Sequence, residues 1–142
     1  NGFVPQIEGY TSERVKGHKF DVAAAQKLLS NAGYKDGKDF PVIDLYVNAK
    51  KGTSIYLLAE GVKEQLKANL NVNLRIVLCT IDERAKAVES GAAKMWRGGW
   101  IADYPDAENY LSLFYSKNFT LMALIILILK IIYMISYFLR EL

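Results

Sequence analysis

Residues 42–78 read VIDLYVNAKKGTSIYLLAEGVKEQLKANLNVNLRIVL and contain two strand-like segments separated by a helix-like one. Residues 42–47 and 74–78 are rich in the β-branched and aromatic side chains that strands favour. From Ser54 to about residue 70, apolar side chains recur at helical spacing. Those expected on the buried face are Ile55, Leu58, Val62, Leu66 and Leu70. Two strands joined by a helix of this length form a βαβ unit, so we expect parallel pairing in an α/β fold.

Further elements are predicted on both sides of this unit. We expect helices over residues 22–32, 81–90 and 107–114, and a third strand over residues 94–100. Asp21 is a suitable N-cap for the first helix, and Gly33 is placed to end it in a left-handed conformation. Asp106 is a suitable N-cap for the last helix, and Glu108 then lies in the first turn, where the helix dipole favours negative charge. At 142 residues, the chain is expected to form one domain.

The composition argues against several classes of protein. The net charge is only +3 and the Lys and Arg residues are scattered, so nucleic acid is not an expected partner. Cys79 is the only cysteine, which excludes an internal disulfide, and we expect it to be a small buried side chain. His18 is the only histidine and is expected in a loop. We therefore expect no enzyme activity, no metal site and no cofactor.

Residues 98–106 read GGWIADYPD and place one carboxylate, Asp103, between apolar residues and a proline turn. One interpretation is that Asp103 accepts backbone N–H bonds within a turn. The other is that it binds a cationic ligand group, with the indole of Trp100 supplying apolar or cation–π contact. Residue chemistry alone leaves both interpretations open.

Residues 97–106, followed by Asn109-Tyr110-Leu111 and Leu113-Phe114-Tyr115-Ser116, resemble the signature of the family 5 extracellular solute-binding proteins. These proteins are dipeptide- and oligopeptide-binding components of ABC importers. Other stretches similar to the family are residues 2–5, 20–34, 35–37, 64–67 and 70–72. The resemblance covers residues 1 to about 120, so we expect a family 5 domain over residues 1–120. Because the chain begins at Asn1 without an initiator Met, we expect this domain to be a fragment.

The resemblance implies the second lobe of a type 2 periplasmic-binding-protein fold, which closes over an extended peptide against a first lobe. In peptide-binding members, the Asp of the Gly-Trp-x-x-Asp-Tyr motif pairs with the α-ammonium group of the peptide, and Asp103 matches that position. Trp100 matches the indole that lines the pocket, and Gly99 and Tyr104 complete the predicted ligand-binding residues. A peptide ligand, an ABC permease as partner and a periplasmic or cell-envelope location are implied in the same way. Without the first lobe, we expect no peptide affinity.

Residues 119–139 are almost entirely apolar, and about 21 residues is the length of a helix that crosses a bilayer. Such a hydrophobic C-terminal helix, in contact with the membrane from Phe119 to Leu139, predicts the alternative function of a small membrane-anchored α/β scaffold or interaction protein. The preferred interpretation is a one-base deletion just after Thr120. Codons permitted for residues 121–127, read one base out of frame, encode the Asn-Gly-x-Asn-Tyr-Thr sequence with which relatives continue. Residues 121–142 would then be a frameshift product.

Overall fold

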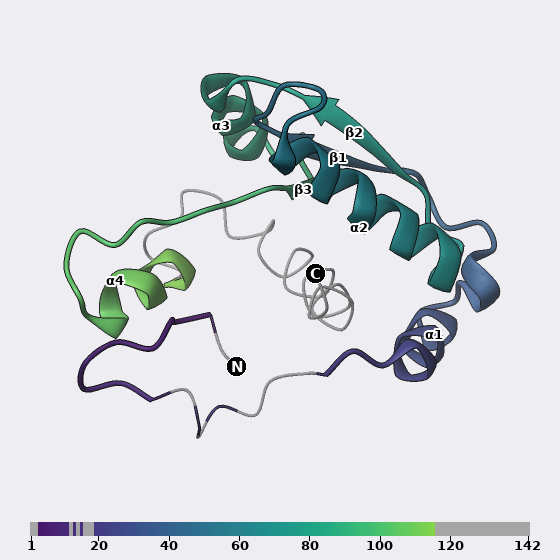
Figure 1. The fold of residues 1–142 in the computed structure, drawn as a ribbon. Helices are drawn as coiled ribbons and strands as arrows, with labels where there is room; N and C mark the ends of the chain where they lie inside the picture. The colour runs from purple at the N-terminus through teal and green to yellow at the C-terminus, as the bar shows by residue number, and fades with distance from the viewer. Residues whose placement is uncertain (1–2, 12, 14, 16–18, 116–142) are drawn as a thin grey trace.

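A computed structural model of the protein describes residues 3–11, 13, 15 and 19–115 (Figure 1). His18 and the hydrophobic helix predicted over residues 119–139 lie outside these residues. Within the described ranges, no helix has the length and apolar character needed to cross a bilayer. Helices and strands alternate along the described chain, which confirms the α/β class.

Three parallel strands form the sheet. β1 (Ile43–Val47) lies between β2 (Leu74–Leu78) and β3 (Met95–Trp96), so the strand order is β2-β1-β3. All five residues of β1 pair with β2, whereas only two pair with β3. Every second residue of β1 is buried, and the residues between them are half-buried, because alternate side chains point to opposite faces of a sheet. The predicted parallel pairing of two strands across a helix is confirmed.

α2 (Ser54–Leu70) connects β1 to β2 and covers the sheet (Figure 1). The side chain of Thr53 caps its first turn, and Asn71 ends it in a left-handed conformation with φ of 55°. Its fully buried residues are Ala59, Val62, Leu66 and Leu70. The prediction that Leu58 lies on this buried face is wrong, because its side chain is 53% exposed. Residues three and four positions before Val62 both lie near the core-facing stripe of a helix, and in the structure Ala59 rather than Leu58 faces the core.

α1 (Val22–Asn31) packs against α2 at one end of the sheet (Figure 1). Asp21 accepts a hydrogen bond from the backbone N–H of Ala24 at 2.8 Å, and Gly33 follows the helix with φ of 95°, so both predicted ends are confirmed. The main core cluster joins α1, α2 and the sheet. It consists of Ala25, Leu29, Ile43, Leu45, Val47, Ala59, Val62, Leu66, Leu70, Val72 and Leu74.

α3 (Ile81–Glu89) leads from β2 towards β3. Its first turn is held by a capping box, in which the Thr80 hydroxyl accepts from the Glu83 N–H at 3.2 Å and the Glu83 carboxylate accepts from the Thr80 N–H at 2.7 Å. Two backbone N–H groups at this helix end are thus paired with local side chains. The helix predicted over residues 81–90 is confirmed to within one residue.

β3 is shorter than the strand predicted over residues 94–100. It contains only Met95 and Trp96, and the prediction is wrong beyond Trp96. β1, its only partner among the described strands, ends at Val47, which in this register lies opposite Arg97, so β1 has no residue left to pair with residues 98–100. Gly98 and Gly99 also lack the side chains that stabilise a strand through cross-strand packing.

α4 (Ala107–Leu111) and the 3-10 turn η3 (Ser112–Phe114) together occupy the place of the helix predicted over residues 107–114. The chain reaches α4 from β3 by an extended path, and the N-terminal segment runs beside α4 (Figure 1). Phe3 packs edge-to-face on Phe114, with ring centroids 4.5 Å apart. This aromatic contact attaches the beginning of the chain to the end of its described part.

Candidate functional site

The segment that the sequence singled out, residues 98–106, begins directly after β3. The Arg97 N–H donates to the Tyr46 carbonyl at 2.8 Å, which is the last link to the sheet. Arg84 of α3 donates to the Arg97 carbonyl at 2.6 Å and to Asn48 Oδ1 at 2.7 Å. One guanidinium group therefore connects α3, the loop after β1 and the start of the 98–106 segment.

Trp100 is bound to α4 through the polar edge of its indole. Its Nε1–H donates to the side-chain oxygen of Asn109 at 2.6 Å. Asn109 is only 4% exposed, whereas the Trp100 side chain is 45% exposed. The N–H of the indole is thus directed towards the protein, while nearly half of the residue stays accessible to a ligand.

Tyr104 is bound to the same turn of α4. Its hydroxyl donates to the Glu108 carboxylate, and this hydrogen bond raises the pKa of Tyr104 above its usual range. The Glu108 N–H in turn donates to the Asp106 carboxylate at 2.7 Å, so the predicted N-cap role of Asp106 is confirmed. The 98–106 segment therefore closes onto the first turn of α4 through two aromatic side chains.

Asp103 lies between these two attachment points and is exposed. No group among the described residues donates a hydrogen bond to its carboxylate or forms an ion pair with it. The turn interpretation required backbone N–H groups bonded to this carboxylate, and the described part of the chain contains no such bond. A carboxylate without local donors is available to a cationic partner.

Gly99 is exposed, and its position does not require glycine for internal packing. A Cβ atom built on Gly99 would meet only the guanidinium of Arg97, at an ordinary contact distance of 3.5 Å. The backbone at Gly99 also has no left-handed conformation. Of the four predicted site residues, Trp100 and Tyr104 are therefore fixed by α4, whereas Gly99 and Asp103 face outward without a structural constraint of their own.

Sequence reasoning missed the residues that hold this segment, namely Arg84, Glu108 and Asn109 in their supporting roles. Glu108 was assigned only to the helix dipole, and Asn109 only to the motif. A signal for Asn109 was present, because the side chain of a residue in the first turn of a helix lies close to the chain that enters that helix. Arg84 gave no such signal, because its partners are 36 and 13 residues away in the sequence.

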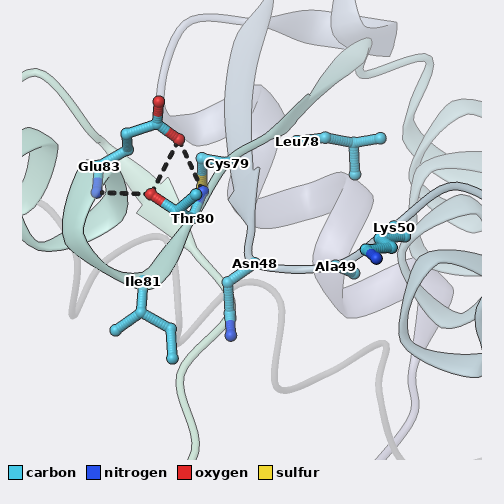
Figure 2. Close-up of a pocket in the computed structure, with 8 residues that line it drawn as sticks. All are labelled: Asn48, Ala49, Lys50, Leu78, Cys79, Thr80, Ile81 and Glu83. Carbon is cyan, nitrogen blue, oxygen red and sulfur yellow. Dashed lines mark hydrogen bonds between the residues drawn. The ribbon is translucent and has the colours of Figure 1, made fainter.

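A second feature was not predicted. An open hollow of about 520 Å³ lies at the carboxyl ends of β1 and β2 (Figure 2), where parallel α/β sheets form their crevices. It is lined by Asn48, Ala49, Lys50, Leu78, Cys79, Thr80, Ile81 and Glu83. Figure 2 shows Thr80 and Glu83 hydrogen-bonded to each other on one side, with Leu78 and Lys50 on the other. The hydrogen bonds from Thr80 lower the pKa of Glu83, so this carboxylate already serves the α3 cap.

Cys79 lies at the edge of this hollow and is half-buried, not fully buried as predicted. Burial raises the pKa of its thiol above the usual range, which favours the neutral thiol over the reactive thiolate. Among the described residues, no group of three or more His, Cys, Asp or Glu side chains is placed to hold a metal ion. Neither observation points to chemistry at the hollow.

A comparison with known families identifies the family of the chain. The sequence model of the bacterial extracellular solute-binding proteins, family 5 Middle, matches residues 1–120. The chain belongs to this family. Because the family is one of solute-binding proteins, the prediction that the chain is not an enzyme is confirmed.

Curated relatives of this family 5 chain carry names that refer to peptides. Di/tripeptide-binding protein 3 of Pseudomonas aeruginosa is 29% identical over 81% of the chain and 21% of its own length. The oligopeptide-binding protein OppA of Bacillus subtilis is 29% identical over 82% of the chain and 21% of its own length. The family 5 chain thus spans about a fifth of the length of the curated relatives it matches.

A solved structure shows the same fold. The periplasmic oligopeptide-binding protein OppAIV of Borrelia burgdorferi superposes with a TM-score of 0.72 and 29% identity. The match covers 82% of the family 5 chain and 23% of that protein. The three-stranded parallel sheet with its helices therefore corresponds to part of an oligopeptide-binding protein structure.

Proposed function

We propose that the family 5 chain is part of the second lobe of a peptide-binding protein that delivers its ligand to an ABC permease. In this proposal Asp103 binds the α-ammonium group of the peptide. The observation that carries it is the exposed Asp103 carboxylate, which has no donor among the described residues and lies between two aromatic side chains fixed to α4. The peptide-binding names of the relatives support a peptide as the ligand.

Each predicted residue has a distinct role in this site. A carboxylate forms short, charge-assisted hydrogen bonds with an ammonium group. The indole of Trp100 contributes apolar contact and a cation–π attraction of about 0.5–1 kcal/mol at an exposed position. The hydroxyl of Tyr104 is already bonded to Glu108, so this residue offers its ring rather than a donor. Gly99 leaves room for the ligand to approach the backbone.

The isolated site is expected to be weak. An exposed ion pair contributes only about 0–1 kcal/mol, because water competes for both charges. Closure of a first lobe over the ligand would exclude that water and strengthen the same pair. The mechanism is therefore capture by lobe closure without bond chemistry. The periplasmic description of the Borrelia relative supports a periplasmic or cell-envelope location for the parent protein.

A chimera provides the test of this proposal. Residues 3–115 would replace the matching segment of the Borrelia burgdorferi protein, and calorimetry would compare trialanine with N-acetyl-trialanine. Acetylation removes the ammonium charge, so we expect trialanine to bind the chimera about tenfold or more tightly, equivalent to about 1.4 kcal/mol or more. Asp103→Ala should reduce that preference to near unity by weakening trialanine binding.

Glu89→Ala is the matched control, because Glu89 is another exposed carboxylate with no hydrogen bond among the described residues. It should leave the preference for the free amine unchanged. Thermal unfolding would confirm that every variant is folded. A folded chimera that binds no trialanine, or an Asp103→Ala variant that keeps the full preference, would refute the proposed role.

A further inference from the structure

Asn109 is the only polar residue that is fully buried in the described part of the chain, at 4% exposure. Burying an amide is unfavourable unless its polar atoms find hydrogen-bond partners. Its backbone N–H donates to the Asp106 carbonyl at 3.2 Å, which belongs to the helical turn itself. The side chain is not needed for that bond, so its burial calls for a separate reason.

The side-chain oxygen of Asn109 supplies that reason at Trp100. It accepts from the indole Nε1–H at 2.6 Å, and an indole has no other donor and no acceptor. The polar edge of Trp100 is thereby used inside the protein. Any ligand that touches Trp100 meets the ring and not an N–H donor, so the indole selects for apolar or cationic groups over hydrogen-bond acceptors.

Asn109 also acts on Tyr104. It lowers the pKa of the Tyr104 hydroxyl, and this opposes the larger effect of Glu108, which raises that pKa. The side-chain oxygen of Asn109 is the atom that accepts from the indole. Leucine would remove this acceptor, whereas aspartate would keep one.

We infer that Asn109 is the positioning residue of the ammonium site, holding the indole of Trp100 by its N–H so that the aromatic surface beside Asp103 is presented to the ligand. The inference rests on the proposed function for its ligand, but the orientation of the indole is testable without one. Asn109 itself touches no ligand. It acts through Trp100, and with Tyr104 it fixes the segment that carries the carboxylate.

The first experiment uses the full 142-residue chain without ligand. The chain has two tryptophans, so Trp96→Phe identifies the indole N–H resonance of Trp100 in a nitrogen–proton NMR spectrum. Asn109→Leu removes the acceptor at similar volume and should shift that resonance and speed its hydrogen exchange about tenfold or more. Asn109→Asp keeps an acceptor oxygen and should retain the slow exchange. Asp106→Ala removes the N-cap of the same helix and should leave the indole N–H protected.

The second experiment measures trialanine binding in the chimera with a double-mutant cycle. Asn109→Leu should weaken binding about fivefold to tenfold when Trp100 is present, and Asn109→Asp should restore part of that loss. In a Trp100→Phe background, which has no indole N–H, Asn109→Leu should have little further effect. Coupling of this kind is specific to a residue that acts through Trp100.

The two experiments separate the inference from the function on which it rests. If the chimera binds no trialanine while Asn109→Leu still frees the Trp100 N–H, the proposed function fails and the positioning of the indole stands. Unchanged exchange of the Trp100 N–H in Asn109→Leu would refute the inference. An Asn109→Leu loss of affinity that is equally large in the Trp100→Phe background would also overturn it, because Asn109 would then act only on the stability of α4.

Discussion

Three glycine-to-alanine substitutions test the close packing between the η2 turn (Lys35–Gly37) and the end of α2. Gly37 has φ of +71°, and a Cβ built on it would lie 2.2 Å from the carbonyl oxygen of Leu70. Gly33 has φ of +95° but nothing within 4 Å of the added atom. Gly61 lies inside α2, also with open space around its Cβ position. The same chemical change therefore meets three different environments.

The expected effects differ in size and sign. Gly61→Ala should stabilise the chain by about 0.5–1 kcal/mol, because alanine favours the helix. Gly33→Ala should destabilise it by about 1 kcal/mol, since a left-handed conformation costs an L-residue about 1–2 kcal/mol and the stiffer unfolded chain offsets part of that. Gly37→Ala has the same backbone cost. Its added Cβ also forces the end of α2 to shift, which costs about 1–3 kcal/mol more, so the total is about 2–4 kcal/mol.

Urea unfolding of the full chain, followed by far-ultraviolet circular dichroism, gives all three free energies on one scale. Equal slopes of the transitions would show that the unfolded states are comparable. The decisive quantity is the difference between Gly37→Ala and Gly33→Ala, because it isolates the contact with Leu70. If Gly37→Ala costs no more than Gly33→Ala, the η2 turn does not lie against the end of α2 and the packing argument is refuted.

Two further predictions concern the sheet and the tail. Arg75 donates to both carboxylate oxygens of Asp44 at 2.6 Å and holds the pKa of Asp44 below its usual range. The pair thus stabilises the folded chain above the unfolded-state pKa of about 4 and is lost as the pH falls through the lower folded-state value. In urea unfolding, Asp44→Asn should be less stable than wild type at pH 7, with a gap that narrows towards about pH 3; a constant gap would contradict this. For the tail, resequencing the gene across Thr120 should reveal a one-base deletion, whereas an intact frame for residues 121–142 in independent isolates would count against it.

Short sequence patterns predicted the structural features that depend on residues close to one another in the chain. The caps at Asp21 and Asp106 could be read from the sequence because a helix end needs acceptors within three residues of itself. The βαβ unit was predictable because its strands and helix have distinct periodicities and a connection that favours parallel pairing. The family resemblance followed from motifs in chain order and was confirmed by the match over residues 1–120.

The errors occurred where a distant partner decides the outcome. The third strand was predicted too long, because β1 ends at Val47 and has no residue opposite residues 98–100, and the length of β1 cannot be read from the sequence of residues 97–100. Leu58 was placed on the core face of α2, whereas the packing surface passes through Ala59. Cys79 follows an apolar strand, yet the open hollow beside it leaves the side chain only half-buried.

The sequence by itself determined that a carboxylate, Asp103, stands between an indole and a phenol in a segment that precedes a capped helix. It could not determine which atoms of those side chains remain available to a ligand. Only the tertiary structure decided that Trp100 directs its N–H to the buried Asn109 and that Tyr104 gives its hydroxyl to Glu108. The physical reason is that the buried side chain of Asn109 must find a hydrogen-bond partner, and that the folded arrangement of the segment on α4 places the indole N–H and the Tyr104 hydroxyl beside their acceptors. Asp103 is left without a donor among the described residues, and that is the basis of its proposed role.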